Sequence, residues 1–67
     1  MSLEEFREAV IKKMMSKGYA DHKSREEIEE TIDGENKDIF DSAFGMLSGH
    51  SVDWCINYAA WNISMCI

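Results

Sequence analysis

The chain has 67 residues, of which 13 are acidic and 7 are basic, so that its formal net charge is −6. This length excludes a large enzyme scaffold, and a content of 45% apolar residues is ordinary for a packed domain rather than for a disordered or low-complexity chain. We therefore expect residues 1–67 to form a single small helical domain, near the lower size limit for independent folding.

The first predicted helix covers about residues 3–17 and has a clear start signal. Ser2 and Glu5 have the spacing of a capping box, in which each side chain bonds the backbone amide of the other residue. Basic residues crowd the last turns, where they suit the negative end of the helix dipole, and Gly18 is the expected residue after them. The apolar stripe consists of Leu3, Phe6, Val10 and Met14, broadened by Ala9, Ile11 and Met15.

The second predicted helix is short, about residues 25–32, and its apolar face is thin. Ser24 and Glu27 repeat the capping-box pattern, and an Asp-Gly pair ends the segment. Ile28 and Ile32 are its apolar pair, one turn apart. Because so short a helix is not stable alone, we expect it to dock on a larger part of the domain.

The third predicted helix covers about residues 36–47. Its apolar residues follow the i, i+1, i+4, i+5, i+8 pattern of a strong helical face, although Gly45 interrupts it at some cost. A Ser-Gly pair stops the segment. The apolar positions are Ile39, Phe40, Ala43, Phe44 and Leu47.

The C-terminal segment, residues 52–67, is the most apolar part of the chain. Ser51 is a candidate N-cap, with Asp53 in the first turn where a carboxylate is favourable. Residues 61–67 also alternate as in a strand, but a single strand would have nothing to pair with, and we favour a helix. The sequence thus predicts an all-α fold, a compact bundle of three to four short helices.

A helix as apolar as the C-terminal one is either the centre of the domain or part of an interface. We favour the central position, and with it a monomer. The second possibility is self-association through Trp54, Tyr58 and Trp61.

Two cysteines, Cys55 and Cys66, fall on this last predicted helix. They would share a face but lie roughly 16 Å apart, too far for a disulfide. We therefore expect two free, buried thiols and a cytoplasmic protein, since disulfides are rare in that reducing compartment. Neither a secretory signal nor an apolar stretch long enough for a membrane-spanning helix is recognisable.

Acidic residues are concentrated in the middle third of the chain. The net charge is +1 for residues 1–20, −6 for residues 21–41 and −1 for residues 42–67. A solvated face that keeps the protein soluble is the plainer interpretation; the alternative is a docking surface for a protein with a basic surface, whose binding would weaken with salt. The candidate partner-binding residues are Glu26, Glu27, Glu29, Glu30, Asp33, Glu35 and Asp38.

Direct nucleic-acid binding, catalysis and metal binding are not expected. The only basic cluster, Lys12, Lys13 and Lys17, is too small for a phosphate-binding surface. The histidines and cysteines lack the paired short spacing of a zinc site, and a calcium loop centred on Gly34 would have Lys37 at a ligand position. No glycine-rich phosphate loop and no oriented nucleophile is present. We predict a protein that is not an enzyme and holds no cofactor.

An acidic chain without catalytic groups favours a function in protein binding. By analogy with the inhibitors that phages and mobile elements direct against host nucleases, polymerases or defence complexes, we expect it to bind, and to inhibit or modulate, a basic nucleic-acid-handling protein. The alternative is a homo-oligomeric structural or adaptor module that uses its apolar C-terminal helix, with the aromatic residues as interface anchors. Only complexes of the acidic region should weaken steeply with salt.

Overall fold

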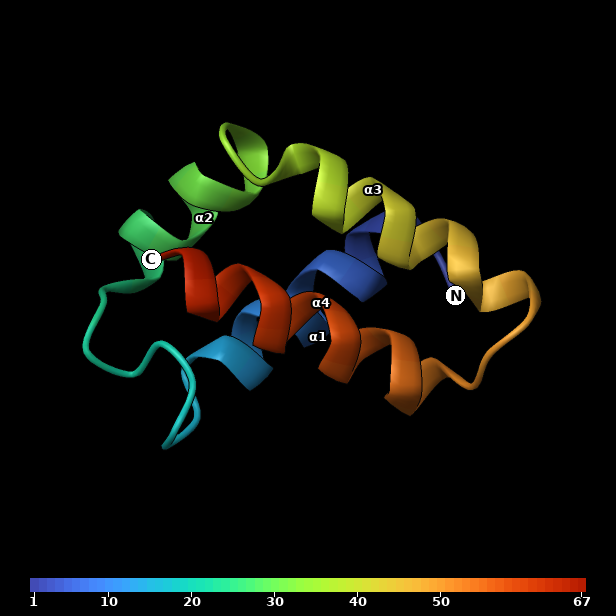
Figure 1. The fold of residues 1–67 in the computed structure, drawn as a ribbon, viewed down its shortest axis with the longest axis horizontal. Helices are drawn as coiled ribbons and strands as arrows, with labels where there is room; N and C mark the ends of the chain where they lie inside the picture. The colour runs from blue at the N-terminus through green and yellow to red at the C-terminus, as the bar shows by residue number, and fades with distance from the viewer.

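A computed structural model describes residues 1–67 and contains four α-helices and no strand. α1 covers Leu3–Met14, α2 Arg25–Asp33, α3 Lys37–Gly45 with a 3-10 turn η1 at Met46–Ser48, and α4 Val52–Cys66. α4 packs against α1 and α3, and the C-terminus lies beside α2 (Figure 1). The predicted compact all-α fold is confirmed. The segment that could have been a strand belongs instead to the longest helix of the bundle.

Serine caps set the beginnings of three helices. Ser2 Oγ accepts from the Glu5 amide at 3.1 Å, and Glu5 accepts in return from the Ser2 amide at 2.9 Å. Ser24 and Glu27 form the same reciprocal pair at 3.2 and 3.1 Å. Ser51 Oγ caps α4 by accepting from the third amide after it at 3.1 Å. These bonds satisfy amides that have no partner inside the helix, and all three predicted starts are confirmed.

Two helices end earlier than predicted. α1 ends at Met14 instead of residue 17, and the chain then turns at Gly18, whose φ of +91° favours glycine. The turn brings the Ala20 amide back to the Met14 carbonyl at 2.7 Å, with the Ala20 side chain in the core. α3 ends as an α-helix at Gly45, and the next three residues tighten into the 3-10 turn.

The hydrophobic core lies between α1, α3 and α4, and α2 docks on its edge. The Phe6 ring packs against the rings of Phe40 and Phe44, with 5.5 Å between centroids in both pairs. Leu3 and Met15, which we expected in the apolar stripe of α1, are 50% and 45% exposed because they lie at the two ends of the helix. The core consists of Phe6, Val10, Ile11, Met14, Ala20, Ile28, Ile32, Phe40, Ala43, Cys55, Ala59, Ala60 and Ile63. None of the four helices is long and apolar enough to cross a membrane.

Candidate functional site

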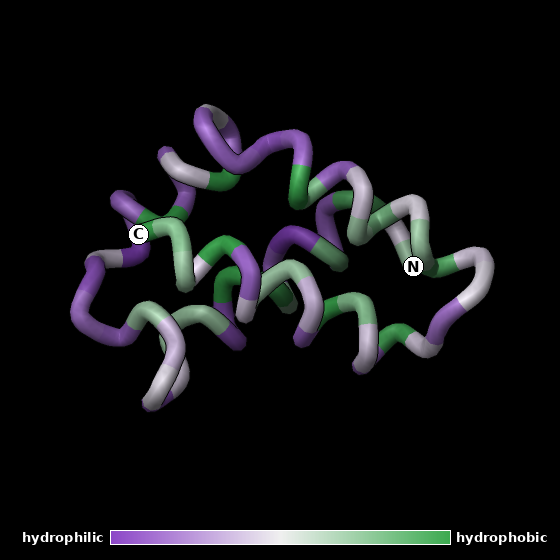
Figure 2. The backbone as a smooth tube through the Cα atoms, viewed as in Figure 1, coloured by the Kyte–Doolittle hydropathy of each residue, from purple (hydrophilic) through white to green (hydrophobic).

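Most of the negative charge lies at one end of the molecule. Hydrophilic residues follow one another through the loop before α2, along α2 and around the turn into α3, whereas much of α4 is apolar (Figure 2). Residues 21–41 carry nine acidic and three basic side chains, a net charge of −6. Arg7 and Glu8 of α1, which contact this region, add one positive and one negative charge and therefore leave the sum unchanged.

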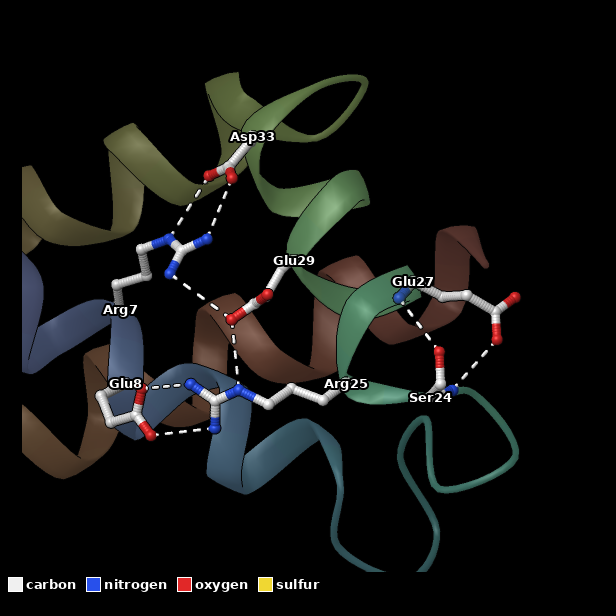
Figure 3. Close-up of polar contacts among 7 residues, drawn as sticks. All are labelled: Arg7, Glu8, Ser24, Arg25, Glu27, Glu29 and Asp33. Atoms are coloured by element: carbon white, nitrogen blue, oxygen red, sulfur yellow. Dashed lines mark hydrogen bonds and ion pairs between the residues drawn. The ribbon is translucent and has the colours of Figure 1, made fainter.

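Two arginines connect α1 to α2 (Figure 3). Arg25 donates two hydrogen bonds to the Glu8 carboxylate, at 2.9 and 2.5 Å, and one to Glu29 at 3.1 Å. Arg7 donates two to Asp33, at 2.9 and 3.3 Å, and its third nitrogen lies 3.9 Å from Glu29. Two of the predicted partner-binding residues, Glu29 and Asp33, are thus engaged in holding α2 on α1.

Glu27, a third predicted partner-binding residue, is engaged at the start of its own helix. The backbone hydrogen bond from Ser24 is the main reason that the pKa of Glu27 lies below its ordinary value, and the Ser24 hydroxyl contributes as well. Lys23 Nζ lies 3.9 Å from the same carboxylate. The charge of Glu27 is therefore held in place by the helix cap.

Acid should weaken the link between α1 and α2. The side-chain hydrogen bond from Arg25 holds the pKa of Glu8 below its ordinary value. A carboxyl with a lowered folded-state pKa stabilises the fold fully above its unfolded value of about 4.3 and loses that contribution as the pH falls through the folded value. We expect Glu8→Gln to lower the melting temperature at neutral pH and to make little difference at about pH 3.

Thermal melts followed by circular dichroism at several pH values would measure this difference. Glu4→Gln is the matched control, because Glu4 lies on the same helix and has no ion-pair partner. A Glu8→Gln deficit that stays constant down to about pH 3 would show that its charge does not hold the two helices together.

The remaining four predicted partner-binding residues, Glu26, Glu30, Glu35 and Asp38, have no ion-pair or hydrogen-bond partner among the side chains. They follow one another along α2, the turn after it and the first turn of α3. We call these four residues the free acidic surface. Part of it borders a shallow groove of about 340 Å³, lined by Lys23, Glu27, Glu30, Thr31, Gly34, Glu35 and Ile67.

A second surface lies on the side of α4 that faces away from the core. Trp54, Trp61 and Met65 are 43%, 48% and 70% exposed there, and Tyr58 is half-buried beside them. His50, Trp54 and Tyr58 form a stack of nearly parallel rings, with centroid distances of 3.9 and 5.3 Å. The predicted aromatic residues are thus brought together. His50 was not among the aromatic residues predicted for this face, although its spacing of four from Trp54 is the signal that would have placed it there.

Tyr19 joins this second surface from the turn after α1. Its ring meets Trp61 edge-on at 5.6 Å between centroids, and its hydroxyl donates to Asn57 Oδ1. Lys13 Nζ lies over the Tyr19 ring, 5.2 Å from its centroid. Nothing in the local sequence pattern predicts that Tyr19 reaches α4, because the contact depends on the turn at Gly18.

Both cysteines are free thiols, as predicted, but only Cys55 is buried; Cys66 is exposed at the end of α4. The chain has no group of three or more His, Cys, Asp or Glu side chains placed to hold a metal ion. No protein-family model matches this chain, and no curated protein and no solved structure is significantly similar to it. The two surfaces are therefore the observations from which a function can be inferred.

Proposed function

We propose that the protein is a non-catalytic binding module whose free acidic surface docks on a basic surface of a protein that handles nucleic acid. The observation that supports this proposal is that some carboxylates of α2 have arginine partners and others have none. Glu29 and Asp33 have arginine partners, whereas Glu26 and Glu30, one turn apart on the same helix, have none. Unpaired like charges at this spacing cost a helix a few tenths of a kcal/mol, so they do nothing for the stability of α2.

A phosphate-binding surface is the partner that best complements these carboxylates. Such a surface presents clustered lysine and arginine side chains, and the free acidic surface offers them a row of negative charge held on a helix, a turn and a second helix. Binding there would exclude nucleic acid and so inhibit or modulate the partner. Both cysteines are free thiols, which suits the cytoplasm as the compartment of this interaction.

Capture of proteins from a lysate by the immobilised protein, compared at about 0.05 M and about 0.5 M salt, tests the proposal. We expect basic nucleic-acid-handling proteins to be retained at low salt, to be lost at high salt and to be displaced by duplex DNA. Retention that resists both high salt and excess DNA would contradict it.

The homo-oligomeric structural or adaptor module remains the second candidate function. One observation favours it, namely the exposure of two tryptophans on the same face of α4. Large exposed aromatic side chains are typical anchors of protein interfaces.

A further inference from the structure

The exposed side of α4 is an apolar face without a partner in the monomer. At 100° per residue, Trp54, Tyr58, Trp61 and Met65 fall within one narrow sector, opposite the buried sector that contains Ala59 and Ile63. We call these four residues the α4 aromatic face. The ring stack from His50 to Tyr58 and the contact of Trp61 with Tyr19 already order its side chains, which reduces the entropy lost on binding.

One flank of the α4 aromatic face carries two opposite charges at different heights along the helix axis. Asp53 lies in the first turn of α4, on the same side of the face as Asn57. Tyr19 lies on that side as well, because its hydroxyl donates a hydrogen bond to Asn57. Its ring contacts both Trp61 and the Lys13 ammonium group, so that Lys13 lies at the same height along α4 as Trp61. Neither Asp53 nor Lys13 has an ion-pair partner in its own chain.

We infer that the α4 aromatic face binds a second copy of this chain, with the two α4 helices antiparallel about a two-fold axis near Asn57. This axis lies in the interface and runs perpendicular to both helices. It reverses the direction of α4 from one copy to the other, but the equivalent flanks of the two copies lie on the same side of the dimer. Trp54 of one copy then faces Trp61 of the other. Asp53 of one copy comes to the level of Lys13 of the other, and this charge pair occurs twice.

The distribution of charge favours this antiparallel arrangement over a parallel one. The groove next to the free acidic surface includes Ile67, so that the negative end of each copy lies at the C-terminal end of α4. A helix of 15 residues is roughly 22 Å long, which exceeds the Debye length of about 10 Å at 0.1 M salt. Antiparallel pairing separates the two acidic ends by that length, whereas parallel pairing would bring them together and would leave Lys13 and Asp53 apart.

Sedimentation equilibrium of the whole chain, from micromolar concentration to about 1 mM, tests the inference. We expect a monomer–dimer equilibrium in which Asp53→Lys and Lys13→Glu each raise the dissociation constant about tenfold, because each turns two attractive pairs into repulsive ones. The double variant Lys13→Glu/Asp53→Lys should restore dimerisation, since it exchanges the two charges. Glu4→Lys, which makes the same change of charge as Asp53→Lys but in the first turn of α1, is the control and should leave the dissociation constant near that of the unaltered chain.

The same measurements can overturn the inference. A chain that stays monomeric at about 1 mM would show that another partner, or none, covers the α4 aromatic face. A dimer that responds to neither single reversal, or that the double variant does not restore, would exclude the proposed register. Trp61→Ala, checked for folding by circular dichroism, provides a second measure, because a dimer that it leaves unchanged would not use this face.

Discussion

Replacing Phe6 by alanine should destabilise the protein severely. The Phe6 ring is fully buried and packs against both aromatic rings of α3, so its loss opens a cavity in the core between α1 and α3. Truncation of a buried phenylalanine costs about 3–5 kcal/mol. A domain of this length has a total stability of roughly 3–10 kcal/mol, so that one such change removes a large part of it.

Urea unfolding followed by circular dichroism would measure this loss. Leu3→Ala is the matched control, because Leu3 lies on the same helix, one turn before Phe6, and is 50% exposed. We expect the control to change the free energy of unfolding by less than about 1 kcal/mol. If the two variants unfold at similar urea concentrations, the core is not organised around Phe6.

Reversing the charge of Glu30 should weaken partner binding at least about tenfold while leaving the fold at least as stable. Glu30 borders the groove, has no ion-pair partner and lies one turn after Glu26. In Glu30→Lys the repulsion within α2 becomes attraction, which favours the helix by about 0.3–0.5 kcal/mol. A partner with a basic surface would instead meet a positive charge, and we expect the dissociation constant of the complex to rise at least about tenfold.

Glu4→Lys is the matched control for this prediction, since it changes the net charge by the same two units on another helix. Titration calorimetry with the captured partner would give both dissociation constants, and thermal melts would give the stabilities. Equal weakening by the two variants would mean that only the total charge matters. Unchanged binding by Glu30→Lys would remove the free acidic surface from the interface.

The sequence was sufficient to predict the all-α fold class and the four helical segments. Side-chain caps are local, so Ser2, Ser24 and Ser51 predicted the starts of three helices correctly. The ends were harder to place, because they depend on contacts with the rest of the chain. α1 stops at Met14 where the next residues turn back to bury Ala20, and no pattern within α1 itself indicates this.

The candidate surfaces were only partly predictable from sequence. The concentration of acidic residues in the middle third was visible, but not which carboxylates are free. Arg7 bonds Asp33 across 26 residues of sequence, a contact that exists only once α2 has docked on α1. Likewise the spacing of Trp54, Tyr58 and Trp61 indicated a shared face, but whether that face was core or surface depended on which side of α4 meets α1 and α3.

Nuclear magnetic resonance of the isotope-labelled protein, recorded with and without its captured partner, tests the central claim most directly. The amide signals of Glu26, Glu30, Glu35 and Asp38 should shift or broaden on binding, and those of Trp54 and Trp61 should stay where they are in the free protein. Changes confined to the exposed side of α4, with the signals of α2 unaltered, would contradict a role of the free acidic surface in recognition.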